Sequence, residues 1–186
     1  MFESLLVKVA SALKKGGIPY MVIGGQAVLQ YGEPRLTRDI DITLGVDVHE
    51  LARVLQVLGG TGLRPVGSDP EEFVQKTNVL PLQDGESGIR VDLIFSFLPY
   101  ERGAIKRSKV FRIGGYDVQY AAVEDVIIHK IIAGRPRDLE DVKGIIVRNT
   151  TCDVDYITRS LHAFEQTLAQ PLVQVFKSIH AGLLSP

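Results

Sequence analysis

The sequence predicts an α/β (α+β) fold that ends in a run of helices. Up to about residue 121, short apolar runs typical of strands are interleaved with stretches whose apolar residues recur at helical spacing. From Val123 onward only the helical spacing remains. We therefore expect a core over residues 1–121, followed by a helical segment over residues 122–186 that packs on it.

The first part of the chain begins with an amphipathic helix from Leu5 to Leu13, which ends before Gly16-Gly17. The same signals then predict a strand at 20–23, a tight turn at 24–25, a short helix at 26–30, a strand at 39–44 and a helix at 49–58.

Two hairpins are expected next. An extended stretch at 73–83 is followed by a polar turn and a strand at 89–95. The second hairpin joins 109–113 to 116–120 through Gly114-Gly115, because glycine readily adopts the positive φ that a two-residue turn requires. Helical spacing then predicts helices at 123–133, 137–147, 154–168 and 172–179.

Composition excludes several classes of protein. Of the 186 residues, 45% are hydrophobic and 23% are charged, which is ordinary for a globular protein, and the net charge of −1 excludes a polycation that binds nucleic acid over its whole surface. The single cysteine, Cys152, excludes an internal disulfide and a zinc site built from cysteines. No apolar run approaches the roughly 20 residues that span a bilayer, so we expect a cytoplasmic protein without a membrane partner.

Two aspartates occupy alternate positions of one predicted strand. Asp39 and Asp41 project to the same face, while Ile40 and Ile42 turn into the core. Neighbouring carboxylates repel each other unless a cation joins them. Hard oxygen ligands suit Mg²⁺, which completes its coordination shell with water and substrate phosphate oxygens. The pair therefore predicts a magnesium site for a nucleoside triphosphate.

A third carboxylate, Asp92, lies on a later predicted strand and is flanked by apolar residues. Nucleotidyl transfer uses a pair of metal ions held on rigid elements, and Asp92 would complete the ligand set. The structural alternative is an ion pair with Arg90, which lies on the same face of that strand.

Glycine and basic residues near the first two acids could hold phosphate. The Gly24-Gly25 turn has no side chains and leads into a helix whose first N–H groups point outward. In the loop before the acids, Arg35 or Arg38 could hold a phosphate or orient a carboxylate bidentately. A solvated loop charge is the alternative for Arg38.

A second group of charged residues lies in the helical segment. Lys130 is on the helix at 123–133, and Asp138 and Asp141 share a face of the next helix because they are three residues apart. The structural alternative is that acids in a first helical turn interact favourably with the helix dipole.

Taken together, these motifs resemble the AbiEii type of bacterial nucleotidyltransferase, within the superfamily that includes polymerase beta. The resemblance runs from about Tyr20 to Ile146. It rests on Gly24-Gly25-Gln26-Ala27, Tyr31-Gly32, Arg35-Leu36-Thr37-Arg38-Asp39-Ile40-Asp41, Val123-Glu124-Asp125, and Lys130 through Arg137-Asp138-Leu139-Glu140-Asp141-Val142.

The resemblance implies a nucleotidyltransferase fold, with a mixed sheet, helices packed on one side and a helical C-terminal segment. It also implies two Mg²⁺ ions held by Asp39, Asp41 and Asp92. Lys130 would contact the nucleotide phosphates, and Asp138 would be a functional acid near the acceptor or the nucleotide.

The expected activity is transfer of a nucleoside monophosphate from an NTP to an acceptor hydroxyl on RNA, such as transfer RNA, or on protein, with Asp92 helping to deprotonate that hydroxyl. Members of this family include toxins of toxin–antitoxin pairs, which implies an antitoxin partner. Two alternatives stay open: an aminoglycoside-type enzyme that modifies small molecules, and a catalytically silent NTP-binding antitoxin or regulatory partner.

Overall fold

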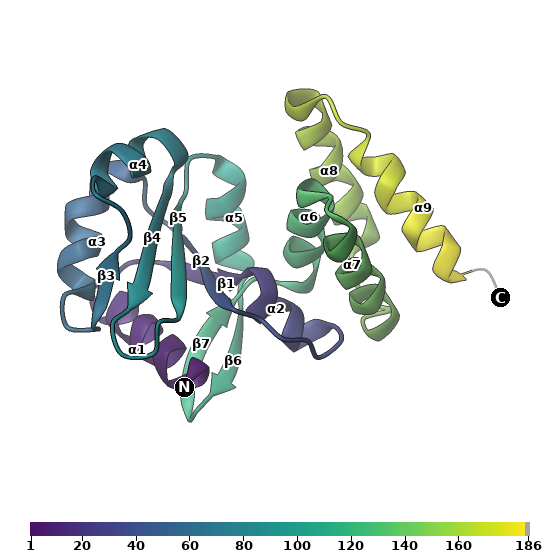
Figure 1. The fold of residues 1–186 in the computed structure, drawn as a ribbon. Helices are drawn as coiled ribbons and strands as arrows, with labels where there is room; N and C mark the ends of the chain where they lie inside the picture. The colour runs from purple at the N-terminus through teal and green to yellow at the C-terminus, as the bar shows by residue number, and fades with distance from the viewer. Residues whose placement is uncertain (185–186) are drawn as a thin grey trace. The chain divides into compact units, whose positions relative to one another are not determined.

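The computed structural model describes residues 1–184, and the contacts divide the chain into two compact units (Figure 1). The first unit contains residues 1–26 and 36–121. The second contains residues 27–35 and the chain from Ala122 onward. Each unit is therefore assembled from segments that are distant in the sequence.

Within residues 1–184, seven strands form one mixed sheet in the order β3-β4-β5-β2-β1-β7-β6, and all of them belong to the first unit. Neighbours β2 and β5 are parallel, as are β1 and β7, and the other neighbours are antiparallel. The strands are β1 (Tyr20–Ile23), β2 (Asp39–Leu44), β3 (Leu63–Pro65), β4 (Val79–Asp84), β5 (Arg90–Phe95), β6 (Lys109–Ile113) and β7 (Tyr116–Tyr120). The predicted α/β fold with a mixed sheet is confirmed.

Strand β2 shows why its acidic residues stay accessible. Ile40 and Ile42 are completely buried, whereas Asp39 and Asp41, which alternate with them, are only partly buried. The buried isoleucines anchor the strand in the core through their apolar side chains. The opposite face at the start of β2 therefore carries carboxylates on a rigid backbone.

The helices of the first unit include α1 and α3, which pack against each other on one face of the sheet (Figure 1). Helix α1 buries Leu6, Val9 and Leu13, and α3 buries Leu51 and Val54. The helices assigned mainly to this unit are α1 (Phe2–Lys15), α3 (Leu51–Leu58), α4 (Pro70–Thr77) and α5 (Pro99–Arg107), with a 3-10 turn at Val48–Glu50 before α3. The predicted helix at 49–58 is thus a 3-10 turn followed by an α-helix.

The chain over residues 70–77 is helical, so the prediction of extended structure was wrong for residues 73–77. The Asp69 side chain caps α4 by accepting the N–H of Glu72 at 2.9 Å, and Pro70 suits the first helical position. Asn78 ends the helix in the left-handed conformation, with φ 57°. The rest of the predicted stretch forms β4, which pairs with β5 as the expected hairpin.

The prediction of a separate tight turn at Gly24-Gly25 was also wrong, because both glycines belong to the first turn of α2 (Gly24–Tyr31). Gly24 has φ +62°, so the direction of the chain changes at the junction of β1 and α2 without an intervening loop. Helix α2 therefore begins immediately after the last residue of β1.

The second unit is helical. Its helices are α6 (Val123–Ala133), α7 (Pro136–Arg148), α8 (Val154–Leu168) and α9 (Leu172–Leu184). The part of α2 from residue 27 onward also belongs to this unit. Helix α6 packs against α7 and α8, and α9 packs against α8 and α7. All four helices were predicted, and α9 continues beyond its predicted end at residue 179. Among the helices described, none combines the length and apolar character needed to cross a bilayer.

Candidate active site

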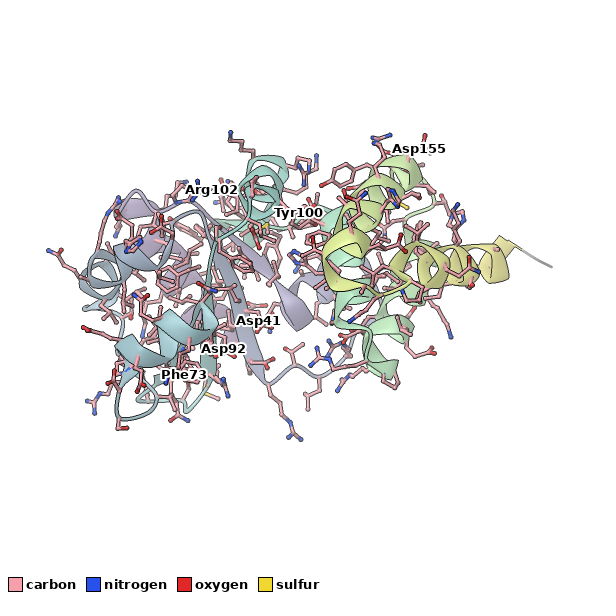
Figure 2. All side chains as sticks on the ribbon, turned by 90° about the horizontal axis from the view of Figure 1, so that it is seen from above. Asp41, Phe73, Asp92, Tyr100, Arg102 and Asp155 are labelled. Carbon is pink, nitrogen blue, oxygen red and sulfur yellow. The ribbon has the colours of Figure 1, made fainter. Side chains whose placement is uncertain are left out.

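The register of the central strands places the three predicted metal ligands together. In the parallel pair β2 and β5, Asp41 lies opposite Asp92, and Asp39 lies opposite Arg90. Residues directly opposite each other on neighbouring strands project from the same face of a sheet, as do residues two apart on one strand. Asp39, Asp41, Asp92 and Arg90 therefore share one face, and Figure 2 shows Asp41 and Asp92 on their adjacent strands.

Gly24 closes one side of this group. Its neighbour Ile23 pairs with Asp41 across β1 and β2. A Cβ atom built on Gly24 would lie 1.9 Å from Oδ2 of Asp41, and the φ of Gly24 is +62°. Both the space and the backbone conformation therefore require glycine at this position. Gly25 follows it in the first turn of α2 and is buried.

Arg90 and Asp92 form the ion pair that the sequence left open as an alternative. Nε of Arg90 lies 2.8 Å from Oδ1 of Asp92, and their side chains are 56% and 17% exposed. The hydrogen bond to Asp92 is the largest cause that raises the pKa of the Arg90 guanidinium, and the charges of Asp39 and Asp41 add to it. Arg90 is thus a cation among three carboxylates.

The donor set suits a divalent cation, although the carboxylates do not converge on one point. Among the described residues, no group of three or more His, Cys, Asp or Glu side chains is gathered as a metal site. The backbone register nevertheless brings three hard oxygen donors to neighbouring positions of two strands. Rotation of the side chains alone could therefore bring the carboxylates of Asp39, Asp41 and Asp92 toward one Mg²⁺ ion, without any movement of the strands.

The loop before β2 carries the other predicted residues of this region. Thr37 Oγ1 accepts a hydrogen bond from Nε2 of Gln26 at 2.7 Å, which fastens the loop to α2 within the first unit. Arg38 is exposed and directly precedes Asp39. Its position agrees with either a phosphate ligand or a solvated charge.

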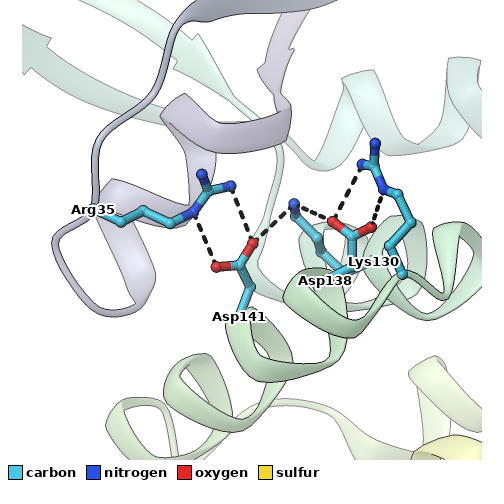
Figure 3. A network of polar contacts seen from close by, with 5 residues as sticks. Arg35, Lys130, Asp138 and Asp141 are labelled. Atoms are coloured by element: carbon cyan, nitrogen blue, oxygen red, sulfur yellow. Dashed lines mark hydrogen bonds and ion pairs between the residues drawn. The ribbon is translucent and has the colours of Figure 1, made fainter.

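In the second unit, Lys130 lies between two aspartates (Figure 3). Its Nζ is 2.7 Å from Oδ1 of Asp138 and 3.0 Å from Oδ2 of Asp141. All three side chains are buried. Buried charges are tolerated only when they are paired, so this arrangement fixes the position of the Lys130 ammonium.

Two arginines complete the network in Figure 3. Arg35 makes a bidentate contact with Asp141, through Nε at 3.0 Å and Nη2 at 3.1 Å. Arg135 donates from Nε to Oδ2 of Asp138 at 2.5 Å. The five side chains of the network carry three positive and two negative charges, which leaves an excess of one positive charge.

The environment of Asp138 keeps it ionised. Burial alone would raise the pKa of this carboxyl, but hydrogen bonds from Arg135 and Lys130 outweigh burial and lower the pKa below its usual value. Asp138 also lies in the first turn of α7. The helix dipole therefore also stabilises the negative charge of Asp138. The aspartate has a second role, because it is an ion-pair partner of buried Lys130.

Sequence reasoning missed the partners within this network. The bidentate role considered for Arg35 applies to Asp141, which is 106 residues away in the chain. No local pattern links two residues at that separation. The pairing of Arg135 with Asp138 could have been inferred from their spacing of three residues along the chain.

Comparison of the sequence with known protein families identifies the family to which the chain belongs. Residues 17–177 match the family described as "Nucleotidyl transferase AbiEii toxin, Type IV TA system". No curated protein matches the sequence significantly. The match covers most of the chain and includes all the residues described above.

Several solved structures share the fold at low sequence identity. The antibiotic-resistance factor ANT(2'')-Ia is 16% identical, with a TM-score of 0.62 over 90% of this chain and 92% of its own. An antigenic nucleotidyltransferase-like protein from Paracoccidioides brasiliensis is 15% identical, with a TM-score of 0.59 over 94% of this chain and 91% of its own. The lincosamide antibiotic adenylyltransferase LnuA is 16% identical, with a TM-score of 0.54 over 76% of this chain and 94% of its own.

These likenesses establish the nucleotidyltransferase fold, and the family match covers the sheet that carries the acids as well as the helices that carry Lys130 and Asp138. The chain therefore belongs to the AbiEii family and is a nucleotidyltransferase.

Proposed function

We propose that the protein is a Mg²⁺-dependent nucleotidyltransferase that transfers a nucleoside monophosphate from an NTP to an acceptor hydroxyl on RNA or protein. The observation that supports this best is the register of β2 and β5. It places Asp39, Asp41 and Asp92 on one face, with Gly24 packed against Asp41. The activity requires NTP, and we propose a cytoplasmic location, where NTP is available.

The bond changes assign a role to Asp92. An oxygen of the acceptor forms a bond to the α-phosphorus, the bond from that phosphorus to the bridging oxygen breaks, and pyrophosphate leaves. The carboxylate of Asp92 accepts the proton of the attacking hydroxyl. Its ion pair with Arg90 holds this carboxylate on the face that carries Asp39 and Asp41 before substrate binds.

Asp39 and Asp41 are proposed as the principal metal ligands, with Asp92 as the third, for two Mg²⁺ ions. Bound divalent cations supply Lewis-acid stabilisation of charge on the phosphates. The N–H groups at the start of α2 and the guanidinium of Arg38 would bind phosphate oxygens, with Gly24 and Gly25 allowing close approach.

Lys130 and Asp138 are proposed as a second functional pair. The buried ammonium of Lys130 would neutralise nucleotide phosphate charge, a role supported by the excess positive charge of its network. Asp138 would hold Lys130 in place and act near the nucleotide or the acceptor. Both roles are carried over from the family resemblance.

The acceptor defines two candidate functions. The family description favours a toxin of a toxin–antitoxin pair, which would act on RNA such as transfer RNA, or on protein, and would have an antitoxin partner. The fold similarity to ANT(2'')-Ia, which has been observed with adenylyl-2''-tobramycin, favours a small-molecule acceptor as the second candidate. That similarity extends over 96% of this chain.

One experiment tests both candidates. Purified protein is incubated with each α-³²P-labelled NTP and Mg²⁺, together with total transfer RNA, cell protein extract, or a panel of aminoglycosides and lincosamides. We expect label in one acceptor class and its loss in Asp39→Asn/Asp41→Asn. Asp117→Asn is the matched control, because Asp117 is an exposed acid on β7 that is paired with Arg112.

A labelled product that persists in the double variant would contradict the proposed role of the acids. Binding of NTP without transfer to any acceptor would favour the catalytically silent partner instead.

A further inference from the structure

Arg90 has an unusual position for a basic residue. It lies directly opposite Asp39 on the neighbouring parallel strand and two residues before Asp92 on its own strand. Both relationships direct its side chain to the face that carries the carboxylates. The 2.8 Å contact between Nε and Oδ1 of Asp92 shows that the guanidinium already supplies positive charge to this face.

The contact with Arg90 engages one of the two carboxylate oxygens of Asp92. Oδ1 of Asp92 accepts the hydrogen bond from Nε of Arg90. For Asp92 to join Asp39 and Asp41 as a ligand, its carboxylate must loosen or share this contact, since the three acids are not gathered as a metal site in the present arrangement. Arg90 and a metal ion therefore compete for the same carboxylate.

The exposure of Arg90 makes this competition reversible. Its side chain is 56% exposed, whereas Asp92 is 17% exposed. An ion pair with an exposed partner contributes little net free energy, because solvent screens it and a long side chain must be ordered. The guanidinium can therefore leave the carboxylate without disturbing the apolar core below the strand.

We propose that Arg90 is the internal counter-ion of the carboxylate site, and that it sets the divalent-metal concentration at which the site fills by competing for Asp92. The inference rests on the proposed function, because it takes Asp39, Asp41 and Asp92 as the metal ligands. Arg90 is a positioning residue for Asp92 and keeps the three carboxylates from repelling one another in the metal-free protein.

The test is to titrate Mn²⁺, as the probe metal, into nucleotide-free protein and to measure its affinity by isothermal titration calorimetry. Removing the competing charge in Arg90→Gln should tighten Mn²⁺ binding by about three- to fivefold, in line with the free energies of exposed ion pairs. Arg90→Lys should lie between Arg90→Gln and wild type, because it keeps the charge but loses the planar fork. The difference should shrink in about 1 M salt, where the screening length is only about 3 Å.

Arg112→Gln is the matched control, because Arg112 is paired with Asp117 across the β6–β7 hairpin, with Nη1 3.0 Å from Oδ1. It should bind Mn²⁺ like wild type. Equal or weaker binding by Arg90→Gln, with an unchanged thermal unfolding curve, would overturn the role of Arg90.

Asp41→Asn separates this inference from the proposed function. Loss of Mn²⁺ binding in that variant, together with unchanged affinity in Arg90→Gln, would leave the metal ligands standing and reject the competition. A wild-type protein that binds no Mn²⁺, or an Asp41→Asn variant that binds it normally, would overturn both the metal assignment and the role of Arg90.

Discussion

At the residue scale, Gly24 and Asp41 constrain each other. The Asp41 carboxylate occupies the space in which a side chain at position 24 would begin, since a Cβ there would lie 1.9 Å from Oδ2. The glycine thus determines where one of the proposed metal ligands can lie. The shape of the site depends on a missing side chain as well as on the charged ones.

The substitution Gly24→Ala should abolish nucleotidyl transfer. The new methyl group would displace the Asp41 carboxylate, and alanine at φ +62° would cost about 1–2 kcal/mol of stability. Gly115→Ala separates the two effects, because Gly115 has φ +82° with no atom within 4 Å of a built Cβ. Urea unfolding should show similar losses of stability in both variants. Activity assays should show that Gly24→Ala alone loses nucleotidyl transfer. Equal activity in the two variants would show that the contact with Asp41 is dispensable.

Asp138 gives a pH-dependent prediction at the same scale. Its pKa is lowered in the folded protein, so its ionised form contributes stability above the unfolded pKa of about 3.9. That contribution is lost as the pH falls through the folded pKa. Breaking this buried pair by Asp138→Asn should cost about 3 kcal/mol at pH 7.

Urea unfolding of wild type and Asp138→Asn between pH 7 and pH 3 measures this contribution. The gap between their free energies of unfolding should be largest near neutral pH. It should narrow as the pH falls below ~4, because the carboxyl of Asp138 is then protonated in the unfolded chain while it is still ionised in the folded protein. A gap that does not change with pH would mean that the lost stability comes from packing rather than from the charge.

At the element scale, the charged network joins the loop after α2 to α6 and α7 within the second unit. Arg35 holds Asp141 of α7 in a bidentate contact, and Asp141 also contacts Lys130 of α6. Arg148, near the end of α7, contacts Glu33 at 2.9 Å, so the same loop is held at two points. The network therefore stabilises a loop that has no regular structure of its own.

A double-mutant cycle tests the Arg35–Asp141 contact. Arg35→Gln and Asp141→Asn should each destabilise the protein. The double variant should lose about 1–3 kcal/mol less than their sum, because either single variant already removes the contact between the two side chains. Urea unfolding of the four proteins supplies the coupling free energy. Additive losses would show that the contact is not formed in solution.

The elements also show what the sequence could predict. Strands β1 and β2 and helices α6 and α8 have the bounds that were predicted, because strong apolar periodicity and clear breakers mark them. Helix α5 was not predicted, since its only buried side chain is Ala104 and it has no apolar stripe. Helix α4 was misread because Phe73 and Val74 resemble strand residues, although Asp69 and Pro70 mark a helix start.

At the scale of the whole molecule, the features that local sequence patterns could not predict are those that depend on contacts between distant segments. The spacing of Asp39 and Asp41 places them on one face from local geometry alone. The position of Asp92 opposite Asp41 depends on the pairing of two strands that are separated by α3, β3, α4 and β4. Likewise, no local signal assigns residues 27–35 to the same unit as α6–α9.

The central claim for the whole molecule is that the carboxylates of β2 and β5 make the chain an enzyme. The most direct measurement is transfer of α-³²P label from NTP to acceptor by wild type, Asp41→Asn and the Asp117→Asn control, after matched unfolding curves have shown that all three fold. The account predicts that Asp117→Asn retains transfer and that Asp41→Asn loses it by at least a hundredfold, about 2.7 kcal/mol of transition-state stabilisation. Transfer by folded Asp41→Asn at the wild-type rate would contradict it.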